Sequence, residues 1–250
     1  MEEYLYAEMY ELEKNHWWFV TRKRIIISFL NRYLIKSSQN KILDAGCGCG
    51  SILCDLKYEG QAFGMDASPE ALRFSKSRFE GVIKQGYLPD DIPWPEEYFD
   101  AILLLDVLEH LNQDSKSLKS LGYHLKRDGV LLLTVPAYMF LWSSHDEVHQ
   151  HYRRYTKKEL STKLLESGYK IQKISYFNTL LFPPIALIRL LRNRLKISGG
   201  SDANLPSPFI NWVLKSIFSV EGHLLRHLNF PFGVSIIAIA TKVYDEPHKV

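Results

Sequence analysis

The sequence predicts an α/β fold, in which helices cover both faces of a doubly wound and mostly parallel sheet. Short apolar runs alternate along the chain with segments that carry helix-start signals, and this alternation indicates βαβ crossovers. The run DAILLLD, residues 100–106, is apolar between its two aspartates, as expected for a strand buried on both faces. The chain has 250 residues, of which 46% are apolar, enough for one sizeable core.

Seven short apolar runs are the predicted strands. In chain order they are residues 41–46, 62–66, 81–84, 100–106, 129–136, 170–177 and 233–243. Capping signals mark two of the helices: Ser68 with Pro69 begins one, and the capping box of Thr156 and Glu159 begins another, which ends at Gly168. The predicted helices are residues 3–15, 21–35, 50–58, 68–79, 114–125, 156–167, 180–196 and 207–228.

These elements predict a single domain over residues 1–250, with cap helices in 3–35 and a helical insertion, 179–232, before the last strand. The N-terminus lacks the apolar core of a signal peptide, and no apolar run reaches the ~20 residues that span a bilayer. The formal charge of +3 is too small to indicate a nucleic-acid partner. The three cysteines crowd together without distant mates, so a reducing compartment, the cytoplasm, is expected.

A glycine-rich loop follows the first predicted strand. The segment DAGCGCG contains Asp44, Gly46, Gly48 and Gly50, and glycines there allow a tight turn and close approach of a ligand. Asp66 ends the next strand about 20 residues later, where doubly wound folds place the acidic residue that binds ribose hydroxyls. Together they predict an adenosine-containing ligand. The spacing GxGxG differs from the dinucleotide pattern GxGxxG, and no lysine follows as in a P-loop.

Four motifs in order resemble the class I S-adenosylmethionine-dependent methyltransferases, in the broad group of methyltransferase type 11 and the quinone-biosynthesis methyltransferases. They are ILDAGCGCG (42–50), GMDASPEAL (64–72), LPDDIPWPEEYFDAILLLDVLEHL (88–111) and LKRDGVLLLTVP (125–136). The resemblance covers roughly residues 16–178. It implies a Rossmann-like methyltransferase fold with an antiparallel last strand, and it implies S-adenosyl-L-methionine as the cofactor.

The resemblance also assigns cofactor contacts. Asp66 would hold the ribose, Asp106 would lie near the amino group and sulfonium, and Arg22 would pair with the carboxylate. Tyr87 stands where relatives often carry an adenine-binding aspartate, which leaves the amide of Leu88 to contact the ring. The aromatic side chains of HWW, residues 16–18, either cover the cofactor or simply pack on the core. The implied cofactor-binding residues are Trp18, Arg22, Asp44, Gly46, Cys47, Gly48, Gly50, Asp66, Ala67, Tyr87, Leu88 and Asp106.

The polar stretch HDEVHQHYRRY, residues 145–155, follows the fifth predicted strand. Loops at the carboxyl ends of parallel strands form the site in this fold, so we expect the stretch to face the methyl acceptor. Histidine suits a general base for an oxygen or nitrogen acceptor, and arginine can grip an anionic one. A metal site and a solvated polar loop are the alternatives. The predicted catalytic residues are His110, His145 and His149, and the predicted acceptor-binding residues are Asp146, His151, Tyr152 and Arg153.

The predicted function is S-adenosylmethionine-dependent methyl transfer to a small-molecule or lipid-like acceptor. A non-catalytic adenosyl-cofactor-binding protein and a nucleotide-dependent oxidoreductase are the alternatives. No metal is predicted, because the cysteines are too few and the histidine stretch lacks a known ligand spacing. The helices of the insertion are amphipathic. They would close the pocket, form the seam of a homodimer, or, through 180–196, contact a membrane surface; the chain is expected to be a monomer or a homodimer.

Overall fold

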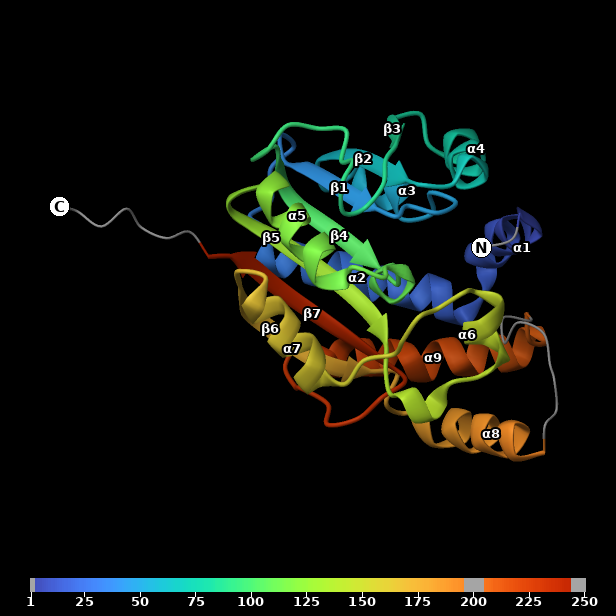
Figure 1. Cartoon of the computed structure of the whole chain (residues 1–250). Helices are drawn as coiled ribbons and strands as arrows, with labels where there is room; N and C mark the ends of the chain where they lie inside the picture. The colour runs from blue at the N-terminus through green and yellow to red at the C-terminus, as the bar shows by residue number, and fades with distance from the viewer. Residues whose placement is uncertain (1–2, 196–204, 244–250) are drawn as a thin grey trace.

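The computed structural model of this protein describes residues 3–195 and 205–243, and its strands share one sheet. The strands are β1 (Lys41–Ala45), β2 (Gln61–Asp66), β3 (Val82–Gln85), β4 (Phe99–Leu105), β5 (Leu125–Pro136), β6 (Tyr169–Phe177) and β7 (Ser235–Lys242). Within the described residues, seven strands lie in the order β3-β2-β1-β4-β5-β7-β6 (Figure 1). Strands β1 to β5 pair in parallel, whereas β7 is antiparallel to both β5 and β6. The predicted fold class is confirmed.

Helices cover both faces of this sheet. They are α1 (Glu3–Asn15), α2 (Trp17–Tyr33), α3 (Leu53–Leu56), α4 (Pro69–Arg78), α5 (Asp114–His124), α6 (Ser144–Val148), α7 (Lys157–Glu166), α8 (Phe182–Arg194) and α9 (Pro208–Leu225), with the short 3-10 helices η1 (Leu108–His110) and η2 (Met139–Leu141). Leucines of α5 and α7 join the core on one face, and apolar residues of α2, α3 and α9 join the core on the other (Figure 1). Among the described helices, none is long and apolar enough to cross a membrane.

Several helix boundaries differ from the prediction, and each difference has a local cause. Helix α2 begins at Trp17 rather than at residue 21, because the His16 side chain accepts a hydrogen bond from the Trp18 amide and caps the helix. Helix α3 is shorter than the predicted 50–58, because Gly50 has a φ of +76°, which is outside the helical region. Short polar helices such as α6 lack apolar periodicity and were not predicted. Residue 196, the predicted end of the α8 helix, lies outside the described residues.

The carboxyl edge of the parallel strands brings the glycine loop close to the end of β4. The amides of Gly46 and Cys47 both donate to the Met65 carbonyl, at 2.7 and 2.9 Å, so the loop folds back over the end of β2. Gly46 has a φ of +83°, and a Cβ on it would collide with Val107. Asp106 also adopts a positive φ, of 55°. These constraints hold the loops after β1, β2 and β4 at one edge of the sheet, where parallel folds bind ligands.

Candidate functional site

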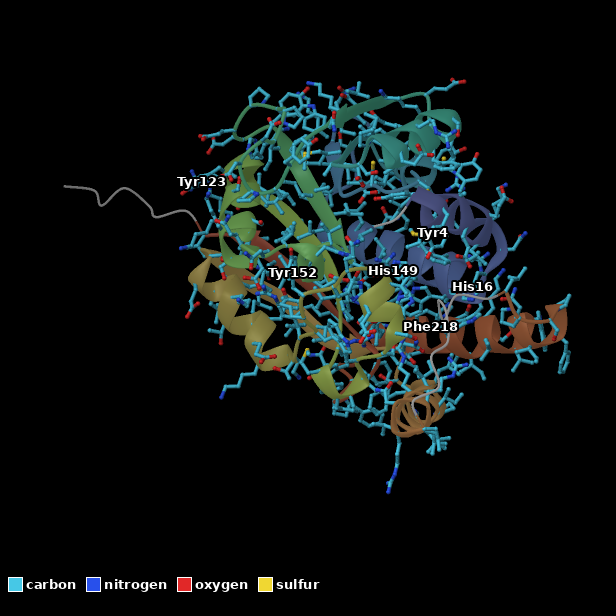
Figure 2. All side chains as sticks on the ribbon, turned by 45° about the vertical axis from the view of Figure 1, so that its right-hand side comes forward. Tyr4, His16, Tyr123, His149, Tyr152 and Phe218 are labelled. Atoms are coloured by element: carbon cyan, nitrogen blue, oxygen red, sulfur yellow. The ribbon has the colours of Figure 1, made fainter. Side chains whose placement is uncertain are left out.

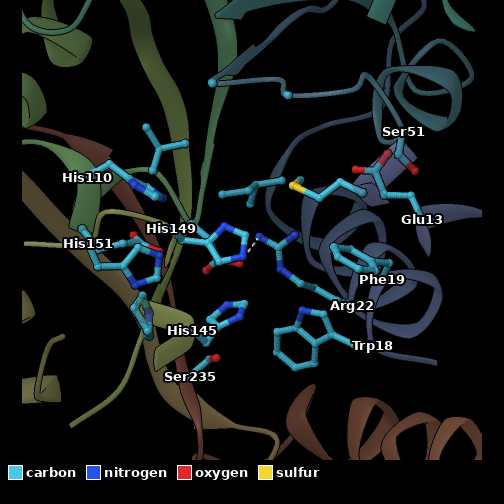
Figure 3. Close-up of a pocket in the computed structure, with 18 of the residues that line it drawn as sticks. Glu13, Trp18, Phe19, Arg22, Ser51, His110, His145, His149, His151 and Ser235 are labelled. Atoms are coloured by element: carbon cyan, nitrogen blue, oxygen red, sulfur yellow. Dashed lines mark ion pairs between the residues drawn. The ribbon is translucent and has the colours of Figure 1, made fainter. Parts of the chain in front are cut away.

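A cavity of about 750 Å³ opens at this edge of the sheet. Helices α1 and α2 border it on one side, and the histidines that follow β4 and β5 border it on the other (Figure 3). Residues of α8 also line it. We call its two parts the glycine end, lined by Gly46, Gly48, Asp66, Ala67 and Leu88, and the histidine end, lined by Glu109, His110, His145, His149 and His151. This volume lies in the range of sites that take cofactors and small molecules.

The predicted ribose acid lies at the glycine end in a fixed position. One carboxylate oxygen of Asp66 accepts a hydrogen bond from the Gly48 amide and the other from the Ser68 amide, both at 2.9 Å. Burial raises the pKa of Asp66. Two other predicted cofactor-binding residues, Tyr87 and Gly50, do not line the cavity. Tyr87 is 49% exposed, and its hydroxyl accepts a hydrogen bond of 2.6 Å from the side-chain amide of Gln85. Gly50 faces Ser75.

Arg22 and Asp106 meet at the border between the two ends. Their side chains form an ion pair of 2.7 Å, drawn as a dashed line in Figure 3. Arg22 also donates to the Thr134 hydroxyl at 2.8 Å, and that hydroxyl donates to Asp106 at 3.0 Å. Trp18 lines the cavity and also stacks on Phe218, with ring centroids 5.2 Å apart, so it packs on the core, and its contact with the cofactor stays a prediction. The network places a positive and a negative group side by side at the cavity wall.

Asp44 is a buried carboxyl group at the floor of the cavity. It is 2% exposed, and its Oδ1 has no hydrogen-bond partner among the described residues. Burial raises the pKa of Asp44 to about 7, against the opposing effect of Arg22. A cationic group of a ligand would supply the missing partner.

The stretch 145–155 begins as helix α6 and is fixed by one buried carboxylate, that of Asp146. Arg154 holds it with two hydrogen bonds, of 2.8 and 2.9 Å, and His151 lies 2.9 Å from it. The Ser143 amide donates to the same group at 2.8 Å. Burial alone would raise the pKa of Asp146. The hydrogen bonds from His151 and Arg154 outweigh burial and hold this pKa well below its usual range. Asp146 does not line the cavity; it contacts His151 and Arg154, which do, so the structure gives it a supporting position rather than one that faces the acceptor.

Four histidines converge at the histidine end (Figure 3). The rings of His145 and His149 have centroids 4.2 Å apart, and those of His110 and His151 are 4.5 Å apart. Burial, with the nearby His151, lowers the pKa of His110 to about 3 and that of His149 to about 4. The predicted residues are therefore brought together, but imidazoles with such pKa values are neutral and weak bases near pH 7.

Two predicted acceptor-binding residues point away from the cavity. Arg153 donates to the Asp114 carboxylate at 2.9 Å and to the Asn112 carbonyl at 3.2 Å. Tyr152 is 60% exposed, whereas His149 is 8% exposed (Figure 2). Neither Arg153 nor Tyr152 lines the cavity, so the structure does not bring these two predicted residues together with the histidines. The next residue, Arg154, is 5% exposed and has the inward position.

Sequence reasoning missed Glu109, and of two adjacent arginines it chose Arg153 for the site rather than Arg154. Glu109 lies in η1 beside His110, is 1% exposed, and lines the histidine end. Burial raises the pKa of Glu109 well above its ordinary value, and the neighbouring Asp106 adds to this effect. A carboxylate inside the apolar context DVLEHL is the signal that could have drawn attention to it.

Comparison with known proteins identifies the family. The family model described as a methyltransferase domain matches residues 18–174, more than half of the chain. The chain therefore belongs to the family of methyltransferase domains, and the recognition made from the four sequence motifs is confirmed. This membership argues against the oxidoreductase alternative.

A probable S-adenosylmethionine-dependent methyltransferase of Mycobacterium tuberculosis is 24% identical over 166 residues, 64% of this chain and 58% of that protein. The match thus spans less than two thirds of that relative's length. A Haloferax volcanii structure, a complex of a methyltransferase with the Trm112 methyltransferase activator, matches with a TM-score of 0.64 and 16% identity over 98% of this chain and 96% of that one. The structure of Haemonchus contortus phosphoethanolamine N-methyltransferase 2, solved with S-adenosyl-L-methionine, matches with a TM-score of 0.58 and 18% identity. The match covers 88% of this chain and 52% of that one. Both structures share the fold.

The contrast between two adjacent arginines gives a prediction of stability. Arg154→Ala leaves the Asp146 charge buried without its main partner and should lower the free energy of unfolding by about 3–5 kcal/mol. Arg153→Ala is the matched control. It removes a partly exposed ion pair with Asp114, whose carboxylate still pairs with Lys163, so the free energy of unfolding should fall by only about 0–1 kcal/mol. Urea unfolding of both variants measures the difference. Equal losses would mean that Asp146 does not anchor the stretch.

Proposed function

We propose that this protein transfers the methyl group of S-adenosyl-L-methionine to a lipid-like acceptor whose polar head lies at the histidine end. One observation carries the proposal: a single cavity of about 750 Å³ connects the glycine end with the histidine end. Methyl transfer is an in-line displacement, so its main requirement is that two bound molecules meet in a fixed orientation. A cavity with two chemically different ends is suited to that requirement.

The residues at the glycine end fit the cofactor. Asp66 would accept hydrogen bonds from the ribose, and the apolar side chains of Ala67 and Leu88 would border the adenine. The pair of Arg22 and Asp106 offers one partner to a carboxylate and one to an ammonium group. Asp44 adds a buried acceptor without a partner for its Oδ1. When bound, S-adenosyl-L-methionine supplies the activated methyl group, and these residues orient it.

Helix α8 supports a lipid-like acceptor. Ile185 and Ile188 give the cavity an apolar wall, and Arg189 and Arg192 add positive charge beside it. An apolar chain would pack on the isoleucines, while the guanidinium groups favour an anionic head. A small polar acceptor would leave the apolar wall without a contact.

The opposite side of α8 supports contact with a membrane surface. Leu187, Leu190 and Leu191 are 58, 47 and 49% exposed, and the 13 residues of α8 include two basic residues in the last turn and no acidic residue. An amphipathic helix of this composition binds anionic lipid surfaces, with its apolar side in the interface. We infer that α8 lies on such a surface and that acceptors reach the cavity from it.

All three cysteines are described and free of disulfides, which supports a reducing compartment, the cytoplasm.

The activity is tested by incubating the protein with methyl-labelled cofactor in two reactions, one with a lipid extract and one with an aqueous extract. We expect label in the organic phase, and Asp66→Ala should weaken cofactor binding by about 1–3 kcal/mol in calorimetry, the range for hydrogen bonds to a charged group. Asp90→Ala, which removes an exposed carboxylate paired with Lys116, is the control and should bind normally. Label in water-soluble product alone would refute the lipid-like acceptor. Cofactor binding without transfer to either extract would favour the non-catalytic alternative.

The raised pKa of Asp44 predicts that cofactor affinity depends on pH. Below its pKa of about 7 the carboxyl is protonated and neutral, whereas above it the carboxylate attracts the cationic groups of S-adenosyl-L-methionine. Affinity should therefore increase as the pH rises from about 6 to about 8. Asp44→Asn cannot ionise and should show a flatter pH profile. The same slope in both proteins, measured by calorimetry, would assign the pH dependence to another group.

The membrane proposal predicts binding to anionic vesicles. The double substitution Leu187→Asp and Leu191→Asp should reduce vesicle binding by ten-fold or more, because each buried leucine contributes roughly 1.5–3 kcal/mol. Leu165→Asp, on α7, removes a leucine that is 60% exposed and serves as the matched control. Co-sedimentation with anionic and with neutral vesicles measures the effect. If the control loses as much binding as the double variant, α8 is not the contact surface.

A further inference from the structure

Three side chains that commonly bind metal ions meet at the histidine end. Glu109 and His110 belong to η1, after β4, and His151 follows α6. Each offers one ligand atom, and the three atoms lie within 4.8 Å of one another. One carboxylate and two imidazoles form a donor set that suits divalent first-row transition metals.

The Glu109 carboxylate needs a partner that the described residues do not provide. It is 1% exposed, and neither of its oxygens has a hydrogen-bond partner there. The nearest arginines bind other carboxylates: Arg22 pairs with Asp106, and Arg154 pairs with Asp146. A buried carboxylate without a partner is unfavourable, so a cation that enters through the cavity would compensate it.

The two histidines are already oriented by other contacts. His151 uses its Nδ1 with the Asp146 carboxylate, 2.9 Å away, which leaves Nε2 as the nitrogen for a ligand. The ring of His110 packs edge-on against the ring of His151, with ring centroids 4.5 Å apart. Histidines that bind metals usually have such a carboxylate or backbone partner on the second ring nitrogen, because it fixes the tautomer and the ring orientation.

We propose that Glu109, His110 and His151 bind one divalent transition metal ion, of the zinc or manganese type. The cavity borders all three residues, so water or an oxygen of the acceptor completes the coordination. This replaces the sequence-based expectation that no metal is used. The ligands were hidden in the sequence because two are adjacent and the third lies in a distant segment, a spacing that matches no recognised metal motif.

The role of the ion rests on the proposed function. A hydroxyl group of the acceptor that binds the ion has a lowered pKa and loses its proton to solvent. A lone pair of that oxygen forms the new O–CH₃ bond, while the S–CH₃ bond breaks and its electron pair remains on sulfur, which gives S-adenosylhomocysteine. The ion thereby supplies the activation of the oxygen, and the acceptor class is an alcohol or phenol.

Metal binding is tested without any acceptor. The whole protein is treated with a chelator and then titrated separately with Zn²⁺, Mn²⁺ and Co²⁺ in a calorimeter. We expect one equivalent of bound ion, with visible absorption bands for Co²⁺. Glu109→Gln and His151→Ala should each lower the affinity by at least about ten-fold. His223→Ala, which removes an exposed histidine of α9, is the matched control and should bind as the parent does.

The folding of the variants is checked by thermal melting. Glu109→Gln replaces a buried acid that has no hydrogen-bond partner among the described residues, so without metal it should melt no lower than the parent, while added ion should no longer raise its melting temperature. No stoichiometric binding to the parent, or equal binding to the parent, Glu109→Gln and His151→Ala, would overturn the proposal. Cofactor binding is measured on the same samples: cofactor binding without metal binding overturns the metal site alone, whereas the absence of cofactor binding overturns the proposed function.

Discussion

The buried ion pair between Asp146 and Arg154 determines the shape of the histidine end of the cavity. Two hydrogen bonds from one guanidinium fix the carboxylate, and the same carboxylate orients His151 and caps α6 through Ser143. Such a buried pair is costly to break, because each partner would be left charged in an apolar environment. The chain after β5 therefore has one stable path, and the histidines that it carries have fixed positions.

The cavity combines two buried acids that lack partners, one at each end. Asp44 and Glu109 are at most 2% exposed, and each has at least one carboxylate oxygen without a hydrogen bond among the described residues. Burial raises the pKa of both groups. A fold that buries acids without partners loses stability, and ligands with positive charge recover it. The two acids thus indicate a cavity that binds cationic groups, while Arg22 and Asp106 lie between them.

Helix α8 links the cavity to the outer surface. Residues 185, 188, 189 and 192 are spaced by three or four positions and line the cavity, whereas residues 187, 190 and 191 lie on the exposed side. The acceptor and membrane contacts proposed for α8 would therefore use opposite sides of the helix. Arg194 in its last turn is exposed and would add attraction for anionic lipid, whereas Arg192 lines the cavity.

The sequence by itself determined the order of strands and helices, the glycine loop and the place of Asp66, because these depend on local patterns of apolar residues, glycines and caps. It also predicted that residues 145–155 would reach the site. Only the tertiary structure decided which of their side chains face inward. Arg153 and Arg154 have the same chemistry, and packing alone directs one to Asp114 and the other to buried Asp146. Likewise, Glu109 lies outside the helices predicted from the sequence, and its burial without a hydrogen-bond partner among the described residues follows only from the tertiary structure.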